Sequence, residues 1–136
     1  IGGCENYRWG LYDWIMIKDN HIDAAGGVRQ AVERAHAYQK EKGLDLGITV
    51  EVRNLVELEE LLDIGGITRI MFDNFEIPIL HEAVAFVNGR FETEASGGIT
   101  LFNVRKYAQS GVNYVSAGSL THSAQPLDLS LKIVRG

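Results

Sequence analysis

Four residues that could take part in catalysis or ligand binding recur at nearly constant spacing. Glu51, Asp73, Ser96 and Gly118 lie 22, 23 and 22 residues apart, each at the end of a short apolar run, and Lys18 ends an earlier run of the same kind. This interval corresponds to one strand and one helix, and right-handed crossovers leave the carboxyl ends of successive parallel strands on one face. In (β/α) barrels that face holds the active site. We therefore predict that Lys18, Glu51, Asp73 and Ser96 point into one cavity.

Lys18 and the two carboxylates form the first candidate group. A lysine at a barrel mouth is poorly solvated unless an anion or a carboxylate pairs with it, so we interpret Lys18 as catalytic rather than as a solvated loop residue. Glu51 and Asp73 offer such carboxylates on neighbouring strand ends. Acids at strand ends also serve as helix caps or surface groups, so each carboxylate alone supports either role.

Two segments rich in serine and glycine form the second candidate group. Residues 94–100 are typical of a strand followed by Ser96, Gly97 and Gly98 and then by the start of a helix. Backbone N–H groups and a helix N-terminus can converge on a phosphate in such a segment. Residues 116–118 end the next unit, and paired loops after the last two strands are the usual phosphate site of such barrels. The alternative is that both segments are tight turns that require positive φ.

Other reactive residue types are sparse. His21 and His122 could titrate near neutral pH, but no histidine or cysteine spacing indicates a built-in metal site, so we expect buried or capping roles for both. Cys4 is interpreted as a small packing residue. A serine hydrolase is disfavoured, because Ser96 lacks the Gly-x-Ser-x-Gly elbow.

The elements that must position these residues alternate between strands and helices, which predicts an α/β fold with parallel strands. A closed eight-stranded barrel needs about 200 residues or more, so we expect an incomplete (β/α) barrel, part of a small open one. Strands are expected at residues 11–18, 47–52, 68–74, 91–96 and 114–118, and alternation at 127–133 predicts one more. Helices are expected from Val28 past Tyr38 to Gly43, from an Asn54–Glu57 capping box to Gly65, from Pro78 to Asn88, and from Thr100 to Gly111.

Composition bounds the possible partners. The chain of 136 residues is 46% hydrophobic and carries a net charge of -5, which fits one compact domain and gives no uniform attraction to nucleic acid or to an anionic membrane. It has one cysteine, which excludes an internal disulfide and favours the cytoplasm. It has no apolar run near the roughly 20 residues of a membrane helix. Because the sequence opens on Ile1-Gly2-Gly3 without a methionine, we expect residues 1–136 to be a barrel fragment that lacks an N-terminal domain and the first barrel strand or strands.

Several short motifs occur together along the chain: Asn6-Tyr7-Arg8, Ile17-Lys18-Asp19-Asn20-His21, Val50-Glu51-Val52, Phe72-Asp73-Asn74, Glu94-Ala95-Ser96-Gly97-Gly98-Ile99-Thr100 and Leu120-Thr121-His122. As a set they resemble one enzyme family, quinolinate phosphoribosyltransferase, also called nicotinate-nucleotide pyrophosphorylase (carboxylating). The resemblance implies a small open barrel whose N-terminal domain exchanges contacts within a homodimer or higher oligomer. It implies a Mg²⁺-dependent step of NAD biosynthesis, in which quinolinate and phosphoribosyl pyrophosphate give nicotinate mononucleotide, pyrophosphate and carbon dioxide.

The resemblance also implies roles for individual residues. Arg8 and Lys18 would face the quinolinate carboxylates, and Glu51 and Asp73 would face the ribose hydroxyls or the metal ion. Ser96, Gly97, Gly98 and Gly118 would bind the phosphate. Ser116 and His122 are also expected among the substrate-binding residues.

The sequence departs from the family pattern in three places. Tyr7 stands where the family usually has histidine, and Thr49 stands where it usually has a second glutamate. Tyrosine keeps a hydrogen-bonding tip but does not become a cation near neutral pH, so the departure bears on how quinolinate would be held. The family's Asp-Thr-Arg-Lys segment is also absent from the chain, and with it further cations.

Two other interpretations stay open. One is a paralogous enzyme, such as the molybdenum-transport-associated relatives of the family, with the same barrel and another substrate; Arg8 and Lys18 argue against it. The other is a structural fragment without an active site of its own. We expect residues 1–136 alone not to catalyse the reaction, because the chain offers few cations for two strongly anionic substrates.

Overall fold

A computed structural model of the chain describes residues 3–122, 127, 129, 131 and 132. Five strands form one sheet in the order β1-β2-β3-β4-β5, and every neighbouring pair is parallel. Because the order in space follows the order in sequence, the sheet is an arc of a barrel, and the α/β prediction is confirmed. The strands are β1 (Trp14–Ile17), β2 (Gly47–Val52), β3 (Arg69–Asp73), β4 (Glu92–Ser96) and β5 (Tyr114–Val115).

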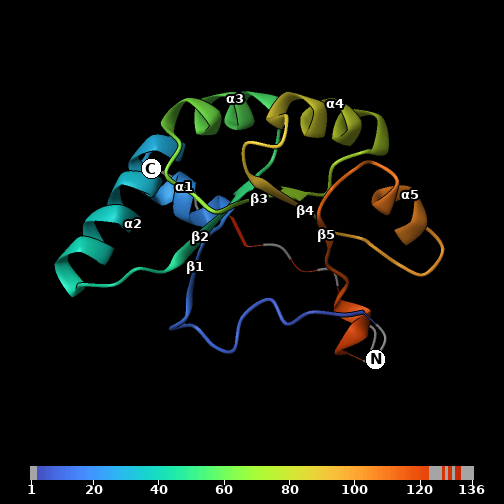
Figure 1. Ribbon diagram of the computed structural model, residues 1–136, viewed down its shortest axis with the longest axis horizontal. Helices are drawn as coiled ribbons and strands as arrows, with labels where there is room; N and C mark the ends of the chain where they lie inside the picture. The colour runs from blue at the N-terminus through green and yellow to red at the C-terminus, as the bar shows by residue number, and fades with distance from the viewer. Residues whose placement is uncertain (1–2, 123–126, 128, 130, 133–136) are drawn as a thin grey trace.

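The helices lie along the outer side of this arc, whereas the segment that precedes β1 crosses its open side (Figure 1). Successive helices contact one another from α1 to α4. Among the described residues no helix has the length and apolar character to cross a membrane. The helices are α1 (Asp19–Ala25), α2 (Val28–Lys42), α3 (Leu55–Ile64), α4 (Ile77–Val87) and α5 (Val104–Ala108), and a 3-10 turn, η1, covers Gly118–Leu120.

The hydrophobic core lies between the sheet and the helices. Alternate strand residues point into it, as in β2, where Val50 and Val52 are fully buried. Fully burying one large apolar side chain stabilises the fold by about 1.5–3 kcal/mol. The helical stripes supply the opposite wall of the core, with buried residues that include Val28, Val32, Leu58, Leu61 and Leu80.

The predicted helix boundaries are confirmed where a local signal fixes them. The Asn54 side chain accepts a hydrogen bond of 3.0 Å from the Glu57 amide. The Glu57 carboxylate accepts from the Arg53 amide at 2.8 Å rather than from Asn54, so the capping box is shifted by one residue. Gly43 ends α2 and Asn88 ends α4, both in the left-handed conformation.

Three predictions of local structure are wrong. The fourth helix begins at Val104 instead of Thr100, because the Asn103 side chain accepts the Thr100 amide (2.7 Å) and donates to the Gly98 carbonyl (3.0 Å), which holds a turn. The last strand ends at Val115, and Gly118 opens a 3-10 turn instead of ending the strand. The first strand begins at Trp14, three residues later than expected.

Two further predictions fail in part. Tyr38 is exposed, and the neighbouring Gln39 is buried in its place, where its side chain accepts from the Leu46 amide at 2.6 Å. The described residues of the expected tail strand, which are Leu127, Leu129, Leu131 and Lys132, belong to no strand. Ile133 lies outside the described residues.

A short helix, α1, was not predicted from the sequence. Lys18 occupies its N-cap position, where a small polar residue is the usual signal. Its first turn is closed by His21, whose Nδ1 accepts the Lys18 amide at 2.9 Å, which confirms the expected capping role for this histidine. Lys18 thus stands at the junction of β1 and α1 and fixes where the chain leaves the sheet.

Candidate active site

The carboxyl edge of the sheet gathers the residues that were expected there. Lys18 directly follows β1, Glu51 lies near the end of β2, and Asp73 and Ser96 end β3 and β4 as register partners. Neighbouring strand residues such as Val52 pack in the helix-covered core. Because strand side chains alternate between faces, Glu51 and Asp73 project from the opposite face, which we call the inner face.

The charges at this edge act on one another. Burial raises the pKa of Glu51 above its ordinary value, and the nearby negative charges of Asp73 and Asp19 add to that rise. The positive charge of Lys18 opposes it. Lys18 itself is exposed rather than poorly solvated, because it caps α1 at the rim. The edge therefore carries an excess of negative charge that would favour a bound cation.

Glu51 and Asp73 could bind a metal ion only if a substrate and water supplied the other ligands. Among the described residues, no group of three or more histidine, cysteine, aspartate or glutamate side chains could hold a metal. Mg²⁺, however, is usually bound through one or two carboxylates together with substrate phosphates and water. The pair formed by Glu51 and Asp73 has the chemistry of such a partial site.

The loop after β4 is a tight glycine turn. Gly97 and Gly98 have φ values of 90° and 59°, in the left-handed region that favours glycine. A Cβ at Gly97 would also lie 2.4 Å from Oδ1 of Asn74, which follows β3. Glycine at position 97 is thus required by the protein itself, whether or not a phosphate binds there. The Thr100 amide is engaged by Asn103, so this amide and a helix start at Thr100 do not supply the expected phosphate contacts.

The loop after β5 lies beside the first loop, but its serine is engaged elsewhere. The Ser116 amide donates to the Ala95 carbonyl at 2.9 Å, and its hydroxyl donates to the carboxylate of the buried Glu94. Gly118 is exposed, and its carbonyl accepts the amide of the exposed His122 at 2.9 Å. Ser116 therefore links two strands, while Gly118 and His122 lie at the accessible turn.

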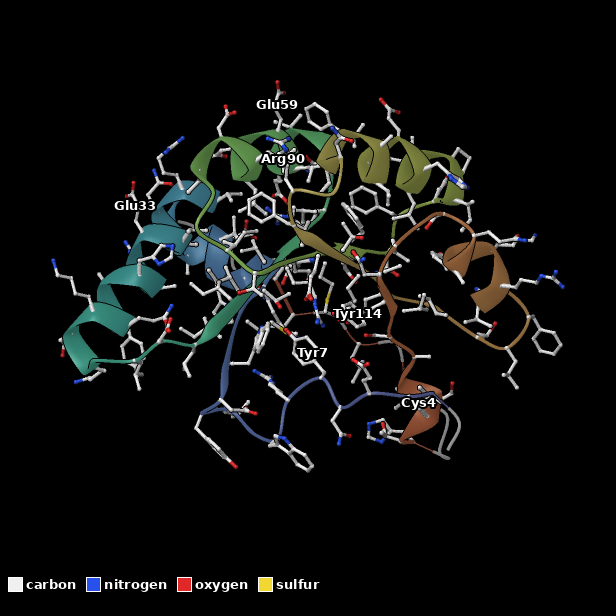
Figure 2. The ribbon with its side chains drawn as sticks, in the orientation of Figure 1. Cys4, Tyr7, Glu33, Glu59, Arg90 and Tyr114 are labelled. Carbon is white, nitrogen blue, oxygen red and sulfur yellow. The ribbon has the colours of Figure 1, made fainter. Side chains whose placement is uncertain are left out.

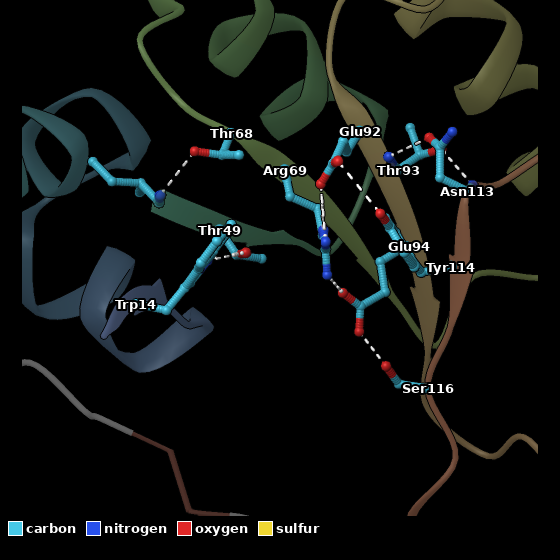
Figure 3. A network of polar contacts seen from close by, with 11 residues as sticks. Trp14, Thr49, Thr68, Arg69, Glu92, Thr93, Glu94, Asn113, Tyr114 and Ser116 are labelled. Atoms are coloured by element: carbon cyan, nitrogen blue, oxygen red, sulfur yellow. Dashed lines mark hydrogen bonds and ion pairs between the residues drawn. The ribbon is translucent and has the colours of Figure 1, made fainter. Parts of the chain in front are cut away.

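The inner face holds an ionic network that was not predicted (Figure 3). Arg69 on β3 donates to Glu92 through Nε (3.1 Å) and Nη2 (2.9 Å), and to Glu94 through Nη1 (3.0 Å). Glu94 is 1% exposed, so its carboxylate depends on these bonds for compensation. The Tyr114 hydroxyl completes the network by donating to Glu92 at 3.4 Å. Alternation along β3 and β4 is the sequence signal that could have placed Arg69, Glu92 and Glu94 on one face.

Three aromatic rings surround the same guanidinium group. The Arg69 Cζ atom lies 3.9 Å from the centre of the Tyr114 ring, 5.5 Å from that of Tyr7 and 5.6 Å from that of Trp14. Figure 2 shows Tyr7 and Tyr114 on the open side of the sheet. Trp14 donates through Nε1 to Thr49 Oγ1 at 2.8 Å, so both residues that depart from the family pattern, Tyr7 and Thr49, lie around this cluster.

Tyr7 contributes an unusual polar group to the inner face. Its hydroxyl oxygen is buried and meets full hydrogen-bond geometry with none of the described residues. Burial raises the pKa of the phenol, and the nearby Thr49 side chain opposes that rise. The neighbouring Arg8 guanidinium lies 5.8 Å from the Tyr7 ring and donates to the Trp14 carbonyl at 3.5 Å. Arg8 therefore contacts the beginning of β1, whereas Lys18 follows its end.

A cavity of about 310 Å³ opens beside this cluster. Its walls include Tyr7, Arg69, Glu94 and Ser116, together with part of the segment that precedes β1. Lys18, Glu51, Asp73 and Ser96 are not among its lining residues. The four residues share an edge of the sheet as predicted, but this cavity is not the common one that was expected for them.

Comparison with known proteins gives a consistent result. Residues 1–132 match the family model described as quinolinate phosphoribosyl transferase, C-terminal domain. The chain is 49% identical over 147 residues to the chloroplastic nicotinate-nucleotide pyrophosphorylase (carboxylating) of Arabidopsis thaliana, a match that covers 98% of this chain and 42% of that protein. It is 41% identical over 132 residues to the probable nicotinate-nucleotide pyrophosphorylase (carboxylating) of Bacillus subtilis, covering 97% of this chain and 44% of that protein.

Solved structures agree with the sequence relatives. The crystal structure of NadC from Streptococcus pyogenes superposes with a TM-score of 0.82 at 40% identity, over 96% of this chain and 45% of that one. A nicotinate-nucleotide pyrophosphorylase from Ehrlichia chaffeensis gives a TM-score of 0.81 at 38% identity, over 90% and 43%. The chain thus spans less than half the length of the relatives that it matches.

Proposed function

The chain belongs to the quinolinate phosphoribosyltransferase family, and from this premise we propose that it is the catalytic barrel portion of an enzyme that makes nicotinate mononucleotide for NAD biosynthesis. The substrates would be quinolinate and phosphoribosyl pyrophosphate, and the other products pyrophosphate and carbon dioxide. The observation that carries this proposal is the electrostatic group of Lys18, Glu51 and Asp73 at one edge of the sheet. The glycine turn at Gly97 and Gly98 adjoins it.

This group suits the chemistry of phosphoribosyl transfer. When the bond between ribose C1 and pyrophosphate breaks, positive charge builds on the ribose ring and pyrophosphate leaves with the bonding electrons. Carboxylates fixed near the ring stabilise that charge without reorganising during the reaction. In this role Glu51 and Asp73 would face the ribose, and the half-buried position of Glu51 strengthens its electrostatic effect.

The acceptor side of the reaction needs cations. The pyridine nitrogen of quinolinate forms the new bond to C1 and becomes positively charged, and the ring then accepts the electron pair left when carbon dioxide departs. A proton replaces the lost carboxylate at that carbon. Lys18 would hold a quinolinate carboxylate at the carboxyl edge and fix the nitrogen toward C1, which is an entropic contribution to the rate. Arg8 would join it at the second carboxylate by turning away from the Trp14 carbonyl at the beginning of β1.

A magnesium ion fits this edge as a companion of the substrate. Glu51 and Asp73 would hold it together with oxygens of phosphoribosyl pyrophosphate, since two carboxylates are a common protein contribution to a Mg²⁺ site. When bound, the ion would neutralise charge on the departing pyrophosphate. Burial is the main cause of the raised pKa of Glu51, and such a cation would relieve the repulsion from Asp73 that adds to it.

The chain would work within a larger assembly. Of the cations at its inner face, Arg69 is already neutralised by Glu92 and Glu94, which leaves Arg8 and Lys18 for substrates that bear several negative charges. We propose that the remaining cations come from a segment equivalent to the part of the relatives beyond this match, within a homodimer or higher homo-oligomer. The cytoplasm is the proposed compartment, although some relatives are named as chloroplastic or mitochondrial.

One observation favours a second candidate function. The residues Tyr7 and Thr49, which depart from the family pattern, both lie at the aromatic cluster of the inner face. A neutral phenol in place of a titratable imidazole weakens the attraction for a dianionic ring. A paralogous enzyme with the same barrel and a less charged acceptor is therefore the alternative to quinolinate.

Turnover by matched variants of the intact protein tests the proposal. Asp73→Asn should lower quinolinate-dependent formation of nicotinate mononucleotide by about 100-fold or more, since it removes one preorganised charge. Asp63→Asn, on the exposed surface of α3, is the control and should leave turnover unchanged. Equal activity of both variants would contradict the assigned site, and turnover of another pyridine acceptor but not of quinolinate would support the paralogue.

A further inference from the structure

We propose that Arg69 is a positioning residue that holds the phosphate-binding turn at Gly118 in place, acting through Glu94 and Ser116. The inference rests on the proposed function, because it assumes that this turn binds the phosphate of phosphoribosyl pyrophosphate. Arg69 itself would touch no substrate. Its part is to fix the geometry of groups that do.

The first link joins Arg69 to a buried carboxylate. Glu94 lies on β4 with a side chain that is 1% exposed, and the Arg69 guanidinium is its ion-pair partner at 3.0 Å. An ionised carboxylate removed from water is strongly unfavourable without such a partner. Arg69 thus holds the orientation of the Glu94 side chain.

The second link joins that carboxylate to the turn. Glu94 uses Oε2 for Arg69 and Oε1 for the Ser116 hydroxyl, so one carboxylate bridges the two groups. Ser116 directly follows β5 and is also bound through its amide to Ala95. With both donors engaged, Ser116 fixes the point at which the chain leaves the sheet, two residues before Gly118. The position of Gly118 therefore depends on the bridge.

The guanidinium group is itself held in one orientation. Glu92 takes two of its nitrogens, and the rings of Tyr7, Trp14 and Tyr114 surround its carbon at 3.9 to 5.6 Å. These rings come from three different segments of the chain. A lysine would keep the positive charge but not the planar fork that reaches both carboxylates. Arginine at position 69 is therefore specified by geometry and not by charge alone.

Variants of the intact protein separate positioning from stability. Arg69→Met should raise KM for phosphoribosyl pyrophosphate by about 10-fold to 100-fold, the scale expected when a binding group shifts by about 1 Å, while kcat changes less. Ser116→Ala should raise the same KM, and the double variant should be no worse than the poorer single variant. Arg69→Lys should restore only part of the loss.

Arg90→Met is the matched control for the loss of a structural arginine. Arg90 donates to the Val87 and Phe86 carbonyls at the end of α4, and within the described part of the chain no hydrogen bond or ion pair joins it to the network. It should lower stability without changing KM for phosphoribosyl pyrophosphate. If Arg69→Met does not fold, Arg69→Lys replaces it in the comparison of KM with the Arg90→Met control.

Hydrogen exchange gives a readout that is independent of turnover. Amides in residues 112–121 should exchange faster in Arg69→Met or Arg69→Lys than in Arg90→Met. An unchanged KM, additive effects in the double variant, or unchanged exchange would each overturn the positioning role. If the wild-type protein does not use quinolinate, the proposed function fails, whereas the exchange comparison still decides whether Arg69 holds the turn.

Discussion

Replacing Gly97 by alanine tests why the loop after β4 contains two glycines. Gly97 and Gly98 both have positive φ, 90° and 59°, but only Gly97 faces a neighbour. A Cβ there would lie 2.4, 2.5 and 2.8 Å from the Asn74 side-chain atoms Oδ1, Cγ and Nδ2, whereas a Cβ at Gly98 would meet nothing within 4 Å. Alanine at Gly98 therefore tests backbone strain alone, whereas alanine at Gly97 tests backbone strain together with a steric clash against Asn74.

The expected magnitudes follow from these two contributions. A residue with a Cβ in the left-handed region costs roughly 1–2 kcal/mol, so Gly98→Ala should lower the free energy of unfolding by about that amount. Gly97→Ala adds the displacement of Asn74, which is comparable to overpacking and costs about 1–3 kcal/mol more. Because Asn74 follows Asp73, its displacement should also raise KM for phosphoribosyl pyrophosphate.

Urea unfolding of the intact protein, with steady-state kinetics on the same samples, measures both effects. Asn74→Gly removes the obstructing side chain and tolerates the φ of 55° at that position. In this background Gly97→Ala should cost no more than Gly98→Ala does in the wild type. Equal destabilisation by Gly97→Ala and Gly98→Ala in the wild-type background would refute the role assigned to Asn74.

Three other predictions concern the core, the pH dependence and the assembly. Leu58→Ala should lower the free energy of unfolding by about 2–5 kcal/mol, because Leu58 is fully buried, whereas Val56→Ala on the exposed side of α3 should change it by less than about 0.5 kcal/mol; equal effects in urea would contradict the packing. The folded-state pKa of Glu51 is raised, so its stabilising contribution is complete below its ordinary pKa of about 4.3 and is lost as pH rises through the raised value. Glu51→Gln should therefore become more stable relative to wild type as pH rises across this range. A difference in thermal unfolding that does not depend on pH would contradict this prediction. Residues 1–136 expressed alone should form no nicotinate mononucleotide under conditions in which the intact protein does, and comparable turnover would show that further cations are dispensable.

The sequence predicted those parts of the fold that local signals determine. The bounds of β2 were predicted to the residue because its apolar run begins and ends sharply, and Asn54 and Gly43 marked helix ends by their side-chain and backbone chemistry. Lys18 gave no such signal at the start of α1. The fourth helix was placed too early because the Asn103 side chain, three residues ahead, competes for the Thr100 amide.

The candidate site was predictable only as a set of strand ends. The spacing of Glu51, Asp73 and Ser96 predicted that they lie on one edge of the sheet. This follows because parallel strands all end at the same edge. The network of Arg69 with Glu92 and Glu94 depends on register between strands, which pairs Arg69 directly with Glu92. Arg69 and Glu92 begin their strands and Glu94 lies in the middle of β4, and neither segment by itself indicates which residues of the other strand it faces.

The stoichiometry of the reaction tests the central claim most directly. Intact protein would be incubated with quinolinate, phosphoribosyl pyrophosphate and Mg²⁺, and nicotinate mononucleotide, pyrophosphate and carbon dioxide would be measured together. The account predicts equal amounts of the three products, all dependent on quinolinate and lost in Asp73→Asn. A folded protein that releases no pyrophosphate in response to quinolinate, or releases it without carbon dioxide, would contradict the proposed function.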